Sequence, residues 1–322
     1  MPNRAEGSKV GILLPTRQAV MAARGGPAPI EPILQMAAHA EALGFDSVWV
    51  GDSITAHPRF DVVTTMAAVA ARTRRVTVGS AVILSALRHP VVLAFQMANV
   101  DIIANGRLIF GVGVGAKTPS NQQMFETCGV PFKKRAAVFE EGLVAMRRLW
   151  CEPSVTFAGE HVRFQDVRLE PRPVQAGGPP VWIGGGSEPA MRRCGRLADA
   201  WFPTSISPDA FAATYRRVQE HARTAGRDPS AIQAGVYFTI NLNADAVKAS
   251  REMEIFGREY YGAEFQKIAA VQGHQAGTPD DVARTLRAFA AAGAQTLVLR
   301  FAAADQNAQL ERAASHLLPR LR

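Results

Sequence analysis

The sequence of 322 residues predicts an α/β protein built as a single (β/α)8 TIM barrel. Short apolar runs alternate with amphipathic helical segments along most of the chain, as in a parallel sheet with helical connections. The runs are nearly continuous in Val, Ile and Leu, which is typical of strands buried on both faces. Eight runs, each followed by a helix, fit one barrel of ordinary size, although a doubly wound open sheet would give the same alternation.

The eight expected strands are spaced widely enough for a helix to follow each one. The strands cover residues 10–14, 47–51, 76–83, 108–114, 181–184, 200–203, 236–242 and 296–301. The expected helices cover residues 30–43, 60–72, 91–103, 133–150, 189–197, 208–225, 244–260, 279–292 and 307–321.

One connection is much longer than the others. Residues 116–180 separate the fourth strand from the fifth, and they are expected to hold a helix and a hairpin with strands at 154–157 and 162–164. Long inserts at the C-terminal end of a barrel commonly shape an active site or a contact between subunits. We therefore expect one domain over residues 1–322 with an insertion at 116–180.

A second stretch, residues 260–277, is also expected to be irregular. It carries Tyr260, Tyr261, Phe265 and His274 among glycines. A mobile lid and a poorly packed surface loop are equally consistent with this composition.

Composition excludes several classes of function. Hydrophobic residues make up 48% of the chain and charged residues 20%, which suits a globular protein with a large core. The net charge of +8 comes from dispersed arginines, so we expect general attraction for anions and no nucleic-acid partner. The three scattered cysteines and the unpatterned histidines predict no metal site and a reducing, cytoplasmic compartment. No apolar run approaches the roughly 18–20 residues that span a bilayer, so no membrane association is expected.

The most informative segment is the fifth strand, which runs into Gly184, Gly185, Gly186 and Ser187. A glycine-rich turn lets backbone N–H groups approach a phosphate closely, and the helix that Ser187 can cap adds a partial positive charge. A tight turn without any ligand would use the same glycines. We expect this turn to hold the phosphate of a cofactor.

Polar residues follow the second strand, at the end of the barrel where such enzymes carry their chemistry. Asp52 shares a pleat face with Val48 and Val50, and we expect this face to point into the barrel lumen. An aspartate that only caps the following turn is the structural alternative. His57 is a candidate proton donor, although a solvated loop histidine is the simpler interpretation.

The end of the fourth strand carries alternating glycines. Gly113 and Gly115 would leave room inside the barrel for a flat ring, unless they serve only close strand packing. The chain also lacks a nucleophile elbow and a lysine placed for a Schiff base. Few protic groups remain at the strand ends, which favours a reaction carried by a cofactor.

Four motifs, taken in order, resemble the bacterial luciferase-like monooxygenase superfamily. They are Gly44-Phe-Asp-Ser-Val-Trp-Val-Gly-Asp52, Val76-Thr-Val-Gly-Ser-Ala-Val82 with Arg88-His-Pro90, Gly106-Arg-Leu-Ile-Phe-Gly-Val-Gly-Val-Gly115, and Gly184-Gly-Gly-Ser187 with Gly195-Arg-Leu-Ala-Asp199. Each motif is weak alone, but together they span nearly the whole chain. The resemblance implies a barrel that binds FMN or the deazaflavin coenzyme F420 at its C-terminal mouth.

The resemblance also assigns residues by position. The expected cofactor contacts are Asp52, Ser80, Ala81, Val82, Gly113, Gly115, Gly185, Gly186 and Ser187. Among these, the peptide between Ala81 and Val82 would be a non-proline cis bond behind the cofactor ring. Many relatives have His where this chain has Ser53, and deazaflavin-dependent sugar-phosphate dehydrogenases have an acid where it has Ala116. A sugar-phosphate dehydrogenase is therefore not expected, and His57 is the remaining candidate general acid.

Three functions are compatible with these features. The leading hypothesis is an oxidoreductase that uses F420 for hydride transfer to or from a small organic substrate. The first alternative is a reduced-FMN-dependent monooxygenase that needs a partner flavin reductase. The second alternative is a protein that binds the cofactor without catalysis, because Ser53 and Ala116 replace the usual proton-transfer groups. The resemblance further implies a homodimer.

Overall fold

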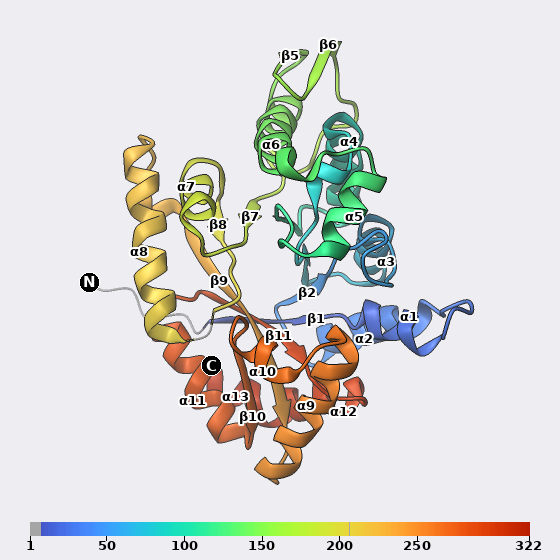
Figure 1. Cartoon of the computed structure of the whole chain (residues 1–322), viewed down its shortest axis with the longest axis vertical. Helices are drawn as coiled ribbons and strands as arrows, with labels where there is room; N and C mark the ends of the chain where they lie inside the picture. Colours follow the sequence, from blue (N-terminus) through green and yellow to red (C-terminus); the bar gives the residue numbers. More distant parts are fainter. Residues whose placement is uncertain (1–7, 206) are drawn as a thin grey trace.

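The protein folds as a closed barrel of eight parallel strands surrounded by helices (Figure 1). The computed structural model describes residues 8–205 and 207–322. The barrel strands are β1 (Lys9–Leu13), β2 (Ser47–Val50), β3 (Thr77–Ser80), β4 (Leu108–Val112), β7 (Val181–Ile183), β8 (Ala200–Trp201), β9 (Gln233–Leu242) and β11 (Thr296–Phe301). All eight predicted strands are confirmed, and the closed sheet excludes the open alternative.

Strand pairing fixes which strands face each other. The ring runs β1, β2, β3, β4, β7, β8, β9 and β11, and β11 pairs with β1 in parallel register. The pairing of β8 with β9 closes the other side. Because β7 stands four places from β1 in either direction, these two strands lie opposite each other across the lumen.

Aromatic side chains fill the middle of the barrel. The rings of Trp49, Trp182 and Phe202 pack with centroids 4.9–5.5 Å apart. Leu13, Ala200 and Val298 complete this buried cluster, which we call the aromatic plug. The plug fills the middle of the barrel and separates its two ends, and we call the C-terminal end the cup.

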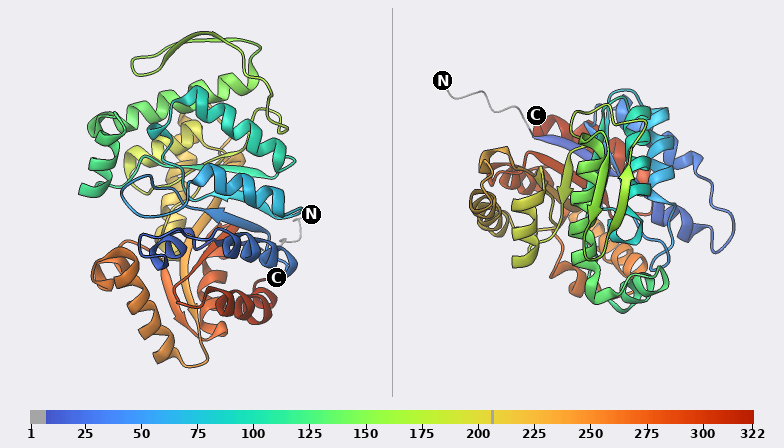
Figure 2. Two further views of the ribbon diagram at one scale, coloured as in Figure 1. Left: turned by 90° about the vertical axis from the view of Figure 1, so that its right-hand side faces the viewer. Right: turned by 90° about the horizontal axis from the view of Figure 1, so that it is seen from above.

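Helices cover the outside of the barrel, and a second, larger core lies between them and the strands (Figure 2). The longer helices are α2 (Glu31–Ala42), α3 (Val62–Arg72), α4 (Pro90–Ile103), α6 (Arg135–Cys151), α7 (Glu188–Leu197), α8 (Pro208–Thr224), α9 (Ala246–Tyr261) and α11 (Pro279–Ala291). The shorter ones are α1 (Thr16–Ala22), α5 (Pro119–Thr127), α10 (Phe265–Ala269), α12 (Gln306–Arg312) and α13 (Leu318–Leu321). A short π-helical turn, Ala313–Leu317, joins α12 to α13 where one continuous helix was predicted.

The connection between β4 and β7 contains both elements that the sequence predicted. Helix α6 packs on the barrel side, and β5 (Val155–Ala158) pairs with β6 (Arg163–Val167) in an antiparallel hairpin. The hairpin lies beyond α6 at one end of the molecule (Figure 1). Helix α5 was not predicted, because its sequence is largely polar and lacks a clear apolar stripe.

Residues 260–277 are ordered into regular elements, so the prediction of an irregular stretch is wrong. Helix α10 follows α9, and β10 (His274–Gly277) pairs with the second half of β9 from Thr239 to Leu242. Tyr260 is only 7% exposed. This segment therefore carries regular structure beside the second half of β9, although much of its surface is exposed.

Three further observations concern membrane-spanning helices, metal-binding groups and cysteines. Among residues 8–205 and 207–322, no helix has the length and apolar character needed to cross a bilayer. The same described residues contain no group of three or more His, Cys, Asp or Glu side chains placed to hold a metal ion. The cysteines Cys128, Cys151 and Cys194 are free thiols.

Candidate active site at the barrel mouth

The segments that follow the barrel strands form the C-terminal mouth, above the aromatic plug. Side chains alternate along a strand, so Gly51 faces the lumen two residues after Trp49 of the plug. A Cβ atom on Gly51 would overlap the guanidinium of Arg59. The loop after β2 thus folds back and places Arg59 inside the mouth, where Gly51 leaves space for it.

The glycine turn, residues 184–187, connects β7 to α7 on one side of the mouth. The indole N–H of Trp201 donates to the carbonyl oxygen of Gly185 at 2.8 Å and fixes the turn. Gly185 has φ +109°, which favours glycine, whereas a Cβ on Gly186 would meet open space. Ser187 is the N-cap of α7 but makes no side-chain capping bond, so its hydroxyl remains free for a ligand. The turn presents an open helix N-terminus suited to an anion.

The face of β2 that carries Val48 and Val50 does not point into the lumen, so this part of the Asp52 prediction is wrong, whereas contact of Asp52 with a cofactor stays a prediction. Val48 and Val50 belong to the outer core against the helices, whereas Trp49 belongs to the plug. The Asp52 carboxylate lies on the outer face and accepts two hydrogen bonds from Arg88, at 2.6 and 3.0 Å. It accepts a third from the backbone N–H of Leu84 at 3.0 Å, and its side chain is 1% exposed. Burial lowers the pKa of Arg88, but the ion pair with Asp52 outweighs burial and raises it.

Packing alone accounts for several of the other predicted contacts. Ser80 is fully buried, and its hydroxyl donates to the carbonyl oxygen of Gly111 at 2.8 Å. A Cβ on Gly113 would lie 2.7 Å from a methyl group of Val82, and one on Gly115 would lie 3.1 Å from the ring of Phe125. These glycines are explained by close strand packing, and their contact with a cofactor stays a prediction.

The floor of the cup lies directly above the plug. The peptide bond between Ala81 and Val82 is cis, as predicted. Both residues and Tyr237 contact the plug and are only partly buried, so the cup is open at this level. Burial raises the pKa of the Tyr237 hydroxyl, which keeps it protonated at neutral pH. A contact of Ala81 and Val82 with a cofactor ring stays a prediction.

His57 lies in the loop after β2 and is half-buried. Its backbone N–H donates to the Ser53 hydroxyl at 2.9 Å, which orders the loop. Burial lowers the pKa of the His57 imidazole from 6.5, and the positive charges of Arg17 and Arg59 lower it further. The lowered pKa therefore favours the neutral form of the imidazole at neutral pH.

A group of arginines and tyrosines, which the sequence analysis missed, occupies the opposite side of the mouth. The Arg17 guanidinium lies 4.3 Å from the centroid of the Tyr260 ring, and that of Arg300 lies 5.0 Å from it. Arg59 donates to the Tyr260 hydroxyl at 3.3 Å. We call Arg17, Arg59 and Arg300 the arginine cluster. One signal was available in the sequence, because Arg300 interrupts the otherwise apolar last strand.

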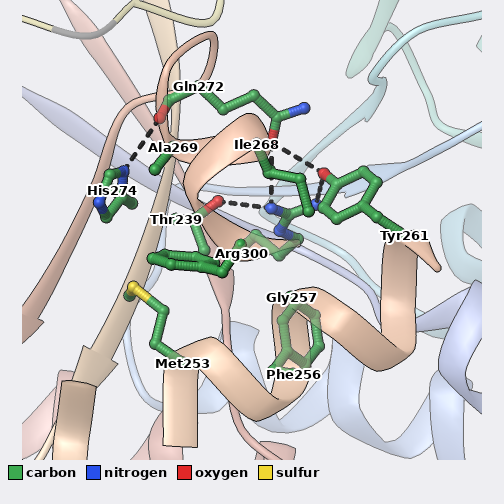
Figure 3. Close-up of a pocket in the computed structure, with 11 residues that line it drawn as sticks. Thr239, Met253, Phe256, Gly257, Tyr261, Ile268, Ala269, Gln272, His274 and Arg300 are labelled. Carbon is green, nitrogen blue, oxygen red and sulfur yellow. Dashed lines mark hydrogen bonds between the residues drawn. The ribbon is translucent and has the colours of Figure 1, made fainter. Parts of the chain in front are cut away.

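Arg300 also lines a narrow pocket beneath α9 and α10 (Figure 3). It donates to the Thr239 hydroxyl at 2.8 Å and to the Gln272 side-chain oxygen at 3.2 Å, and it also contacts the Tyr261 hydroxyl. The pocket walls are mostly apolar, with Met253, Phe256 and Ile268 among them. All hydrogen-bond partners of Arg300 in this arrangement are neutral.

Comparison with known proteins agrees with this architecture. The sequence pattern of luciferase-like monooxygenases matches residues 8–309. The chain belongs to the luciferase-like monooxygenase family.

Curated relatives of this family member are named as oxidoreductases. An F420-dependent glucose-6-phosphate dehydrogenase from Intrasporangium calvum is 29% identical over 317 residues, which cover 88% of this chain and 92% of the relative. A 5,10-methylenetetrahydromethanopterin reductase from Methanolobus tindarius is 25% identical over 230 residues, covering 70% of this chain and 67% of the relative.

Solved structures show the same fold. An F420-dependent secondary alcohol dehydrogenase, in complex with an F420–acetone adduct, matches with a TM-score of 0.82 at 20% identity; the match covers 98% of this chain and 100% of that one. A monooxygenase from Streptomyces bottropensis matches with a TM-score of 0.81 at 26% identity, again over 98% of this chain and 100% of the other. The first of these supports the fold alone, because its sequence identity is low.

Proposed function

We propose that the protein is an oxidoreductase that uses coenzyme F420 for hydride transfer to or from a small organic substrate. The observation that carries this proposal is the extent of the match to F420-dependent relatives. The relatives from Intrasporangium calvum and Amycolatopsis mediterranei align with 88% and 90% of this chain and with more than nine-tenths of their own length.

The residues at the mouth fit a phosphate-bearing cofactor. The glycine turn offers an open helix N-terminus, with unobstructed space at Gly186 and a free hydroxyl at Ser187. The partly exposed surface formed by Ala81, Val82 and Tyr237 lies in the cup beyond it. In the proposed arrangement the glycine turn holds the cofactor phosphate, and the floor of the cup supports the ring.

Hydride transfer also requires a proton to move. When bound, the deazaflavin supplies or accepts the hydride. Oxidation of an alcohol then leaves a hydroxyl proton, and the neutral imidazole of His57 can accept it; reduction of a ketone reverses this transfer. The lowered pKa favours the neutral imidazole, which is the form that accepts a proton when an alcohol is oxidised.

The second candidate is a reduced-FMN-dependent monooxygenase with a partner flavin reductase. It is favoured by the likeness to the monooxygenase from Streptomyces bottropensis, at 26% identity and a TM-score of 0.81. Ser53 and Ala116, in place of the usual proton-transfer groups, also weaken the case for a dehydrogenase.

A homodimer and a cytoplasmic location complete the proposal. Helix α4 exposes Val92, Phe95, Ile102 and Ile103 by 39–53%, an apolar stripe that a second subunit can cover. If sedimentation measurements show a monomer in solution, the proposed homodimer is wrong. The free thiols of Cys128, Cys151 and Cys194 support a reducing compartment.

Turnover assays distinguish the two candidate reactions. The purified protein is supplied with reduced F420 and a panel of ketones without oxygen, and separately with FMN, a flavin reductase and oxygen. Ketone-dependent oxidation of reduced F420 is expected. Oxygen-dependent product formation with FMN, and none with F420, would replace the proposal by the monooxygenase.

A further inference from the structure

The arginine cluster brings three positive charges together without a carboxylate partner among the described residues. Arg17 and Arg300 are 7% and 5% exposed. Within residues 8–205 and 207–322, no carboxylate lies within 4.0 Å of a nitrogen atom of Arg17, Arg59 or Arg300. Buried charges in proteins are normally paired, because removal of an ion from water is strongly unfavourable.

The hydrogen-bonding capacity of the cluster is also incomplete. The Nε atoms of Arg17, Arg59 and Arg300 are buried and have no hydrogen-bond partner in the described structure. Burial lowers the pKa of Arg17; the interaction with Tyr260 raises it in part, and repulsion from Arg59 lowers it. The aromatic faces of Tyr260 and its neighbours stabilise the guanidinium groups in part. Burial raises the pKa of the Tyr260 hydroxyl, but Arg59, Arg300 and Arg17 outweigh burial and lower it, so this one hydroxyl is shared by three cations. An anion would remove the repulsion and satisfy unused donors.

The position of the cluster separates it from the glycine turn. Arg17 follows β1, Arg59 follows β2, and Arg300 lies near the end of β11. These three strands are neighbours in the ring, and β7, which carries the glycine turn, lies opposite β1. A cofactor phosphate on the glycine turn would therefore leave the cluster free on the far side of the cup.

We propose that the arginine cluster binds an oxyanion, a carboxylate or phosphate, that is carried by the substrate. Arginine is suited to this because its planar fork of N–H donors matches both groups. The proposal rests on the proposed function and narrows its substrate to a small anionic alcohol or ketone. It also places the substrate near His57, which lies two residues before Arg59 in the loop after β2.

The test is a calorimetric titration of inorganic phosphate, and separately of succinate, into the protein with and without saturating F420. The variants are Arg17→Gln, Arg59→Gln and Gly186→Val. Arg72→Gln is the control, because Arg72 is exposed on α3 and pairs only with Glu31. Thermal melting of each variant shows whether it is folded. If Arg17→Gln is unstable, Arg59→Gln replaces it in the titrations, because Arg59 is less buried.

The expected result is saturable anion binding that persists with F420 and in Gly186→Val. It should weaken by about tenfold or more in Arg17→Gln or Arg59→Gln, which corresponds to the loss of a charged hydrogen bond, and stay unchanged in Arg72→Gln. Binding that disappears with F420 or in Gly186→Val would place the anion on the glycine turn and overturn the proposal. So would the absence of saturable binding.

One further outcome shows whether the anion bound at the cluster belongs to the substrate or to the cofactor. If Arg17→Gln weakens the binding of F420 itself, the cluster holds an anionic group of the cofactor, and the substrate assignment is overturned. If F420 does not bind the wild-type protein at all, the proposed function fails, but the titrations without F420 still decide whether the cluster binds anions.

Discussion

Replacement of Asp52 by alanine should destabilise the fold more than it weakens cofactor binding. The Asp52 carboxylate is 1% exposed and accepts hydrogen bonds from both ends of the Arg88 guanidinium and from the Leu84 backbone. Through these bonds it joins the end of β2 to the segment that precedes α4. Asp52→Ala would leave the Arg88 charge and the Leu84 N–H without this partner.

The magnitude follows from the surroundings of Arg88. Removing one member of a buried ion pair destabilises a protein by about 3–5 kcal/mol. Arg88 is 13% exposed and keeps a second partner, Asp61, at 3.3 Å, so the lower end of this range, about 3 kcal/mol, is expected. With about 2.1 cal/mol/K of unfolding entropy per residue, this lowers the melting temperature by about 4 °C.

Calorimetric melting and fluorescence titration with F420 measure the two effects on the same variant. Asp52→Asn is the matched control, because it keeps the side-chain volume and one acceptor while removing the charge. The melting temperature should fall in both variants, and further in Asp52→Ala. The dissociation constant for F420 should stay close to that of the wild-type protein in both. An unchanged melting temperature with tenfold weaker F420 binding would instead place Asp52 in contact with the cofactor.

Three other predictions concern the glycine turn, the histidine and the strand packing. Gly186→Val should weaken F420 binding by about 1–3 kcal/mol in equilibrium titrations while leaving the melting temperature unchanged, because only open space surrounds that position; unchanged affinity would remove the turn from the site. His57 has a folded pKa below 6.5, so the unfolded chain takes up more protons than the folded one as the pH falls through 6.5, and stability is lost there. His57→Gln should therefore lose less stability than the wild type in denaturation measured below pH 6.5, and identical pH profiles would contradict the lowered pKa. Gly111→Ala should destabilise the barrel by about 1–3 kcal/mol in chemical denaturation, because the new Cβ would overlap the Ser80 carbonyl oxygen, and a wild-type midpoint would refute this packing argument.

The architecture could be predicted from the sequence because strand signals were strong and well separated. Most of the barrel strands lie in clear apolar runs, and the glycine turn marks its own position through three consecutive glycines. By contrast, β10 has the sequence His-Gln-Ala-Gly, which carries no apolar alternation. It is a strand because it pairs with β9, and this tertiary interaction leaves no signal in the local sequence.

The inward face of a barrel strand was harder to predict. In β2 all four residues, from Ser47 to Val50, are buried, so hydrophobicity does not distinguish the lumen from the outer core. The choice between the two faces depends on the aromatic plug, in which Trp49 meets side chains from β7 and from the segment after β8. The arginine cluster escaped prediction for a similar reason, since Arg17, Arg59 and Arg300 converge from distant segments.

A crystal structure of the protein with bound F420 tests the central claim most directly. The account predicts that the cofactor phosphate lies within hydrogen-bond distance of the backbone N–H groups of the glycine turn, with the ring in the cup against Ala81 and Val82. It also predicts that the guanidinium groups of Arg17 and Arg59 remain free of the cofactor. A phosphate bound at the arginine cluster, or a ring outside the cup, would contradict the account.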